Sequence, residues 1–246
     1  AGPAAVAAAV VVATLHAARA TPVDVRVDGG VIRGRRVRVQ PVPPGGNATR
    51  PEPTDIDEFL GIPFAAPPVG GLRFCPPVAP LPWEGVLETT QFGAQCMQKR
   101  SLGMPDIPIS EDCLYLNVWT PRINLNRSAA LPVAVWIHGG AFTGGSSAVA
   151  LYNGQQWAAT PTTDTDERFV VVTINYRLSS FGFYGSPSIF DEFGTAGNAG
   201  FLDQQLALRW VHNNIAQFGG DRSRIFLFGE SAGGASICVH LAAEQQ

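Results

Sequence analysis

Within the 246-residue chain lies IFLFGESAGGASICVHL, residues 225–241. The apolar run 225–228 predicts a buried strand, and the small and apolar residues after Ser231 predict a helix. Between them, residues 229–233 fit the pattern G-x-S-x-G, a sharp turn that joins a strand to a helix. Its glycines lack Cβ atoms, so the strand and helix can approach closely and hold Ser231 above the end of a sheet. We predict that Ser231 is a nucleophile; the alternative is a tight turn whose serine only caps the helix.

A second motif upstream is VWIHGGAFTGGSS, residues 135–147. A strand is expected to end at His138, and Gly139, Gly140 and Ala141 follow it with small side chains. Acyl transfer develops a negative oxygen, and preorganised backbone N–H groups stabilise it by roughly 3 kcal/mol each. An H-G-G loop followed by G-x-S-x-G is far more specific than either motif alone. His138 is therefore predicted to be a structural residue of this loop, and not the general base.

Composition excludes some classes of function. The chain is 46 % hydrophobic, which is typical of a packed globular protein. Its net charge of −3 leaves no surplus of Lys and Arg to neutralise phosphates, so nucleic acid is not expected as a partner. No apolar run of 18 residues follows the N-terminal region, so no spanning helix is predicted there. Membrane association through an anchor stays undetermined.

The N-terminal stretch AAVAAAVVVATLHAARA, residues 4–20, predicts a secretory signal peptide cleaved after Ala20. The alternative is a buried Ala/Val helix. The chain starts with neither Met nor a basic segment, so we expect the start of this leader to be incomplete. Secretion makes disulfides possible, and the sequons at Asn47 and Asn126 predict glycosylation. The domain itself is expected to cover residues 21–246.

The rest of the chain predicts an α/β sheet. Residues 23–39 alternate apolar and polar side chains around Asp28-Gly29-Gly30, which indicates a β-hairpin. Apolar runs at 114–119, 131–138 and 168–176 are typical of strands covered on both faces. Residues 198–220 have apolar side chains at helical spacing, and Gly219-Gly220 should end this helix. Buried strands alternating with helices favour one α/β unit.

Several stretches together carry a resemblance to a known family: FLGIPFAAPPVGGLRF (59–74), SEDCLYLNVWTP (110–121), VWIHGGAF (135–142), INYRLSSFGF (174–183), NAGFLDQQLALRWVHNNIAQFGGD (198–221) and FGESAGGAS (228–236). From about residue 23 onward, the chain resembles the type-B carboxylesterase and cholinesterase family, and it matches an N-terminal part of such proteins. The resemblance implies the α/β-hydrolase fold. In that fold a mostly parallel central sheet has helices on both faces, and here an N-terminal antiparallel hairpin precedes it.

The resemblance also implies roles for individual residues. Ser231 becomes the nucleophile, the N–H groups of Gly140, Ala141 and Ala232 form the oxyanion hole, and Glu230 lines the site and helps to orient the catalytic histidine. It further implies a Cys96–Cys113 disulfide, whose loop of 16 residues gives about 3 kcal/mol of stabilisation. Structural ion pairs are implied between Arg73 and Glu111 and between Arg177 and Asp203. Cys75 and Cys238 have no evident mate, and Cys238 is expected to be a free thiol in the core.

Two departures from the family pattern refine the function. The loop between Cys96 and Cys113 holds no aromatic residue, whereas acetylcholine-binding members place a tryptophan there for cation–π binding of the ammonium group. A general carboxylic-ester hydrolase is therefore favoured over a cholinesterase. The second departure is that no histidine suits the role of base. His240 lies nine residues after Ser231, about 13.5 Å along a helix, and His212 is expected to be exposed.

Two classes of function follow. The first is a secreted serine esterase that hydrolyses small carboxylic esters through an acyl-enzyme on Ser231, with no metal or organic cofactor. Its acid and histidine would follow Ser231 in chain order, beyond the sequence given. The second is a non-catalytic adhesion protein on the same fold. The intact serine turn and H-G-G loop favour the esterase.

Overall fold

The computed structural model describes residues 21–42, 52–100, 103–121, 130–161 and 168–243. The predicted leader (1–20) and both sequons, Asn47 and Asn126, lie outside these ranges. The strands are β1 (Thr21–Val27), β2 (Gly30–Val39), β3 (Thr54–Pro63), β4 (Val86–Glu88), β5 (Tyr115–Pro121), β6 (Leu131–Ile137), β7 (Val170–Ile174) and β8 (Gly220–Gly229). The α-helices are α1 (Gln155–Ala159), α2 (Ser179–Phe183), α3 (Pro187–Phe193), α4 (Ala199–Asn214) and α5 (Ala232–Ala243).

The strands form one mixed sheet in the order β1-β2-β3-β5-β7-β6-β8, with β4 paired to β2. The predicted hairpin is confirmed, because Val27 at the end of β1 pairs with Gly30 at the start of β2. In the described residues the sheet is mixed, and every pair from β1 through β7 along this order is antiparallel. Parallel pairing needs a crossover. Only β6, β7 and β8 are joined by helical crossovers, through α1 and through α2–α4, and they pair in parallel.

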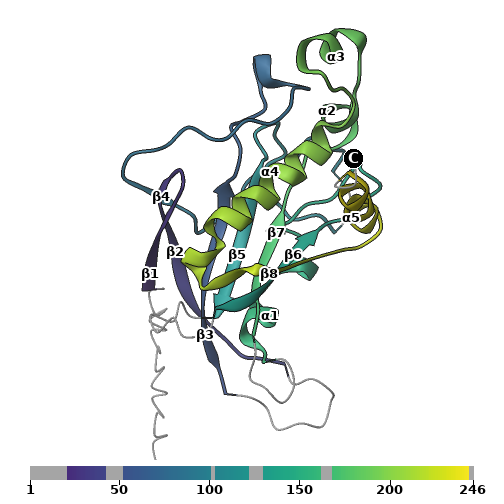
Figure 1. Cartoon of the computed structure of the whole chain (residues 1–246). Coiled ribbons are helices and arrows are strands. Elements are labelled where there is room, and N and C mark those ends of the chain that lie inside the picture. Colours follow the sequence, from purple (N-terminus) through teal and green to yellow (C-terminus); the bar gives the residue numbers. More distant parts are fainter. Residues whose placement is uncertain (1–20, 43–51, 101–102, 122–129, 162–167, 244–246) are drawn as a thin grey trace, which may run out of the picture.

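Helices cover both faces of this sheet, as predicted (Figure 1). The longest, α4, lies across one face, where Ala207, Trp210 and Val211 join the larger hydrophobic core. On the other face the short α1 places Ala158 and Ala159 against Trp119 in a second, smaller core. The strands between these layers, β6 and β7, are buried along almost their whole length, which explains their continuous apolar sequences.

The end of the long helix follows the prediction closely. α4 ends at Asn214 and continues as a 3-10 turn, Ile215–Phe218, whose apolar ends are buried. Gly219 then takes the left-handed conformation at φ 82° and ends the turn, and Gly220 already belongs to β8. His212 is exposed on the outer face of α4, as expected.

Three predicted covalent and ionic contacts are present. The Cys96–Cys113 disulfide is formed. The Arg177 side chain donates to both carboxylate oxygens of Asp203 at 2.8 and 2.7 Å, and both residues are buried. This pair fastens the segment after β7 to α4. The Arg73–Glu111 pair, at 2.5 and 2.6 Å, lies nearer the surface.

One cysteine prediction is wrong. Cys75 is a buried free thiol, but Cys238 is exposed and does not lie in the core. The helix α5 buries only the stripe formed by Ala232, Gly233, Ser236 and His240. Cys238 lies on the opposite side of the helix, where no described element covers it.

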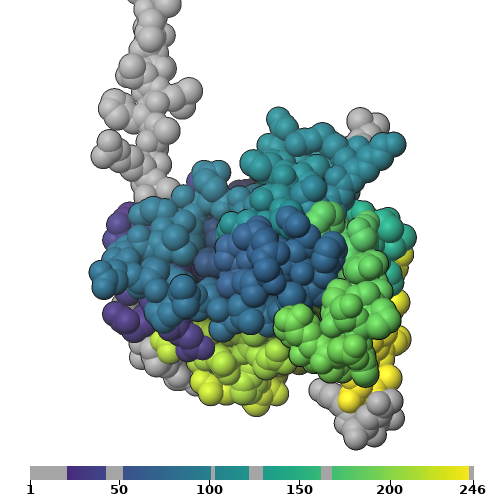
Figure 2. All heavy atoms as spheres, turned by 90° about the horizontal axis from the view of Figure 1, so that it is seen from above, coloured from purple at the N-terminus to yellow at the C-terminus, as the bar shows by residue number. Residues whose placement is uncertain are grey.

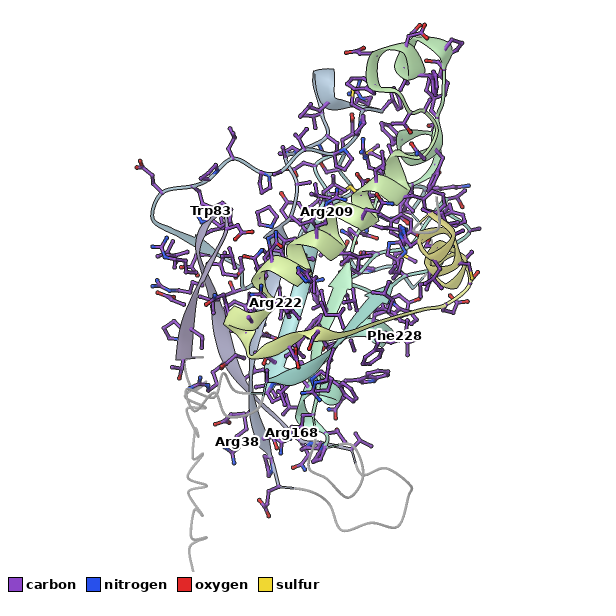
Figure 3. The ribbon with its side chains drawn as sticks, viewed as in Figure 1. Arg38, Trp83, Arg168, Arg209, Arg222 and Phe228 are labelled. Atoms are coloured by element: carbon purple, nitrogen blue, oxygen red, sulfur yellow. A yellow bond between two sulfur atoms is a disulfide. The ribbon has the colours of Figure 1, made fainter. Side chains whose placement is uncertain are left out.

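Loops from distant parts of the chain meet above the ends of β6 and β8. Seen from above, the segments that follow β3 lie beside the α2–α3 region (Figure 2). At the far edge of the sheet, Trp83 lies against the β1–β2 hairpin, and its indole N–H donates to the Val31 carbonyl at 2.9 Å (Figure 3). Within the described ranges, no helix is both long and apolar enough to cross a bilayer.

Candidate active site

The serine turn has the predicted geometry. β8 ends at Gly229, α5 begins at Ala232, and the exposed Ser231 sits between them in the left-handed conformation, at φ 55°. A non-glycine residue there stores roughly 1–3 kcal/mol of strain, which persists only where the surrounding structure imposes it. The turn is held by the Gly233 N–H, which donates to the Glu230 carbonyl at 2.9 Å, and by the Ala235 N–H, which donates to the Ser231 carbonyl at 3.0 Å.

The surrounding constraint is the close approach of α5 to the end of β6. A Cβ atom added to Gly233 would lie 2.0 Å from the carbonyl oxygen of Ile137, the last residue of β6. No side chain fits at that distance, so a residue with a Cβ would force the helix and the strand apart. The glycine at this position is what allows the serine turn to sit directly over the sheet.

The H-G-G loop lies directly against the serine turn. A Cβ on Gly139 would lie 2.6 Å from the Glu230 carbonyl oxygen and 3.2 Å from the Ser231 Cβ. The two residues that follow Gly140 in this loop, Ala141 and Phe142, have φ values of 53° and 59°. The backbone of this loop is therefore strained at two successive residues. The structure thus brings together the two motifs that are distant in the sequence.

Three backbone N–H groups are available next to Ser231. Within the described residues, the N–H groups of Gly140, Ala141 and Ala232 form no hydrogen bond. Ala232 is the first residue of α5, where the helix dipole adds positive potential. Free donors beside a serine are the arrangement that stabilises an oxyanion. The assignment of these three groups as an oxyanion hole stays a prediction that this placement supports.

Gln98 supports the H-G-G loop, and sequence reasoning missed it. Its side-chain oxygen accepts from the Gly145 N–H at 2.9 Å, and its amide donates to the Gly145 carbonyl at 2.7 Å. Gln98 lies two residues after Cys96, so the disulfide holds it near the loop. No local pattern marks this glutamine, because its partner is distant in the chain.

His138 is a structural residue, as predicted. Its ring is buried and stacks on Tyr176 with centroids 4.5 Å apart, and its Nδ1–H donates to the Gly139 carbonyl at 2.8 Å. The Tyr176 hydroxyl in turn donates to the His138 carbonyl at 2.9 Å. Burial lowers the pKa of His138 from 6.5 to about 4. A ring with so low a pKa is a weak base, and its role is to hold the start of the loop.

Glu230, the residue before Ser231, lines a cavity of about 310 Å³. Trp136, Tyr152 and Phe228 form its aromatic walls, and Phe228 lies at the end of β8 that leads into the serine turn (Figure 3). Burial, and secondarily the charge of Glu230, raises the pKa of Tyr152. The predicted roles of Glu230, lining the active site and orienting a histidine, stay predictions.

The remaining candidate groups do not reach Ser231 as a base. His240 is buried on α5 with Nε2 2.8 Å from the Gln204 side-chain oxygen, and His212 is exposed on α4. Among the described residues no cluster of His, Cys, Asp or Glu has the geometry of a metal site. Among the described residues, Ser231 thus has N–H groups without hydrogen bonds near it, and no histidine is placed to act on it as a base; its role as a nucleophile stays a prediction.

Comparison with known proteins shows the family of this chain. Residues 21–246 match the model of the carboxylesterase family, and the chain belongs to that family. It is 46 % identical over 197 residues to an acylcarnitine hydrolase of Mus musculus and 43 % identical over 222 residues to a cocaine esterase of Oryctolagus cuniculus. The matched regions cover 76 % and 86 % of this chain and 33 % and 37 % of those relatives.

A solved structure gives the same result for the fold. A PNB esterase, 42 % identical, superposes with a TM-score of 0.71 over 87 % of this chain and 39 % of its own. The chain thus spans somewhat more than a third of the length of that esterase, and the predicted α/β-hydrolase fold and family are both confirmed. The homologues are carboxylic ester hydrolases by name.

The close approach at Gly233 gives a matched pair of substitutions. Gly233→Ala is expected to lower the free energy of unfolding by about 1–3 kcal/mol, because its Cβ overlaps the Ile137 carbonyl. Gly234→Ala, one residue further, meets only the Gly229 carbonyl at 3.5 Å and should raise it by up to about 1 kcal/mol through helix propensity. Equilibrium unfolding in urea measures both. Equal losses in the two variants would contradict the constraint.

The buried His138 predicts a pH dependence of stability. The pKa of its imidazole is 6.5 in the unfolded chain and about 4 in the folded protein. Its contribution to the free energy of unfolding is therefore complete above pH 6.5 and is lost as the pH falls toward 4. The loss amounts to about 3 kcal/mol. Urea unfolding between pH 7 and pH 4 should show this slope, and His138→Asn, which retains a donor but does not titrate, should flatten it. The exposed His212→Asn is the control and should leave the slope unchanged.

Proposed function

We propose that the whole protein is a serine esterase that hydrolyses small carboxylic esters through an acyl-enzyme on Ser231. The observation that carries this is the contact between the two motifs: the strained Ser231, at φ 55°, lies beside Gly139 of the H-G-G loop. Strain of this kind is typical of a functional turn, because a merely structural turn gains nothing from it. The intact site also favours the esterase over a non-catalytic adhesion protein on the same fold.

In the proposed reaction the Ser231 oxygen attacks the ester carbonyl carbon and forms a C–O bond, while its proton passes to a base. The carbonyl oxygen becomes negative and accepts hydrogen bonds from the N–H groups of Gly140, Ala141 and Ala232. The alcohol leaves with the proton, which produces the acyl-enzyme. Water then attacks the acyl carbon, and the carboxylic acid and free Ser231 are released.

The base and the acid of this mechanism are proposed to come from sequence after residue 246. In α/β-hydrolases with the G-x-S-x-G turn, the chain order is serine, acid, histidine. The relatives named above are about three times as long as the matched region, which leaves room for both groups. The names of those relatives refer to acylcarnitine and cocaine, which supports a small-molecule substrate.

Labelling tests the proposal directly. A fluorophosphonate probe should bind Ser231 of the whole protein covalently, and the protein should hydrolyse p-nitrophenyl acetate. Ser231→Ala should remove the label and lower kcat by at least about 1000-fold, while Ser223→Ala, at an exposed position of β8 outside the serine turn, should still be labelled. If the folded protein takes up no label and hydrolyses no ester, the adhesion reading replaces this one.

We also propose that the protein is secreted. The predicted leader at residues 1–20 and the disulfide Cys96–Cys113 support an oxidising compartment. Expressed in animal cells, the whole protein should appear in the medium, and its mass should fall after treatment with an N-glycosidase. Asn47→Gln and Asn126→Gln should each reduce that mass shift. Retention of an unmodified protein in the cytosol would refute the proposal.

A further inference from the structure

The candidate oxyanion hole has two arms: the loop arm is the N–H groups of Gly140 and Ala141, and the helix arm is the N–H group of Ala232. Three aromatic rings pack around the loop arm. Phe142 follows Ala141, and its ring packs edge-to-face against Phe183 of α2 and Phe201 of α4, with centroids 5.2 and 5.6 Å apart. Phe183 and Phe201 pack edge-to-face on each other at 5.3 Å, so each ring contacts the other two. The Phe142 carbonyl also accepts from the Ser179 N–H at 2.7 Å. The left-handed backbone at Ala141 and Phe142 is thus held from one side by α2 and α4.

The helix arm is held by a buried polar network that starts from the same helix α4. The Gln204 amide donates to the Ser236 hydroxyl at 3.0 Å, and the His240 Nε2–H donates to the Gln204 side-chain oxygen at 2.8 Å. The Ser236 hydroxyl donates to the carbonyl of Ala232, one turn earlier, at 2.9 Å. Gln204 and Ser236 are fully buried. The network therefore fixes the first turn of α5, which carries the Ala232 N–H, relative to α4.

Phe201 and Gln204 lie one turn apart on α4, so they face the same side of the helix. The helix itself has little freedom to move. Between them Asp203 makes the buried pair with Arg177 and also accepts from the Arg177 backbone N–H at 2.9 Å. Further along, Trp210 and Val211 anchor α4 in the core. Figure 1 shows α4 lying across the sheet with its first turns near α2.

We propose that Phe201 and Gln204 are positioning residues that set the distance between the two arms of the oxyanion hole. Phe201 acts through Phe142 on the Ala141 and Gly140 N–H groups, and Gln204 acts through Ser236 and α5 on the Ala232 N–H. We call this pair the α4 brace. The inference rests on the proposed esterase function. Neither side chain touches the nucleophile; both act on the donors, whose separation must match one oxygen atom.

The α4 brace predicts a specific effect of substitutions on kcat and KM. Hydrogen bonds weaken steeply with small displacements of the donor, and a misplacement of about 1 Å can cost 100-fold in rate. Because the donors act on the charge that develops in the transition state, their displacement lowers kcat and leaves KM nearly unchanged. A residue that only supports the fold would lower the amount of active protein and leave kcat per active site intact.

The experiment compares variants of the whole protein, with active sites counted by fluorophosphonate titration. Phe201→Leu and Gln204→Leu should each lower kcat by about 10- to 100-fold, with KM changed by less than about threefold. Their affinity for an aryl trifluoromethyl ketone should fall in parallel with kcat. The Ser231 oxygen adds to the carbonyl carbon of this ketone, and the oxyanion that forms occupies the same oxyanion hole. Because the ketone has no leaving group, the adduct does not react further. Phe201→Tyr retains the ring and should restore kcat to within about threefold of the wild type.

Leu208→Ala is the matched control. Leu208 also lies on α4, one turn beyond Gln204, and packs against the main core, but it belongs to neither the ring cluster nor the polar network. It should lower the unfolding midpoint and leave kcat per active site unchanged. Normal kcat and normal ketone affinity in both brace variants, or equal kcat losses in Leu208→Ala, would overturn the brace while the esterase stands. A wild-type protein that neither takes the label nor hydrolyses ester would instead overturn the proposed function.

Discussion

The approach of α5 to the end of β6 is the constraint on which the site depends. Gly233 lies so close to the Ile137 carbonyl that a Cβ would come within 2.0 Å of it. With the helix this low on the sheet, the chain must reverse sharply between Gly229 and Ala232, and Ser231 is forced into the left-handed conformation. The same closeness places the loop that follows Ile137 directly against the serine turn. One contact between a strand and a helix thus determines where both motifs lie.

The strain at Ser231, Ala141 and Phe142 must be held by packing elsewhere, because each of these residues leaves its preferred backbone region. The contacts that hold it come from separate elements. Gln98, two residues after the disulfide-bonded Cys96, fixes the far end of the H-G-G loop, and the stacked His138 fixes its beginning. The aromatic rings around Phe142 fix its middle. These contacts offset the backbone strain and hold a local geometry that the isolated segments would not adopt.

Most of the fold could be predicted from local sequence. The alternation in residues 23–39 predicted the β1–β2 hairpin, and the apolar runs predicted β5, β6 and β7 as buried strands. Helical spacing and Gly219 predicted α4 and its end. The order of the strands in the sheet could not be predicted from local sequence, because it depends on which connections cross over. The exposed position of Cys238 was also missed, since an apolar helix pattern does not say which side is covered.

Some residues of the candidate site could likewise be predicted from the sequence, and others could not. Ser231, the small residues of the H-G-G loop and the structural role of His138 follow from sequence, because a turn or a close approach restricts which residues a position accepts. Gln98, Phe201 and Gln204 carry no such mark. Their partners lie far away in the chain, and any side chain of suitable size and polarity is compatible with its own local helix or loop. Only the tertiary structure decides these contacts, because they exist only once separate elements pack together.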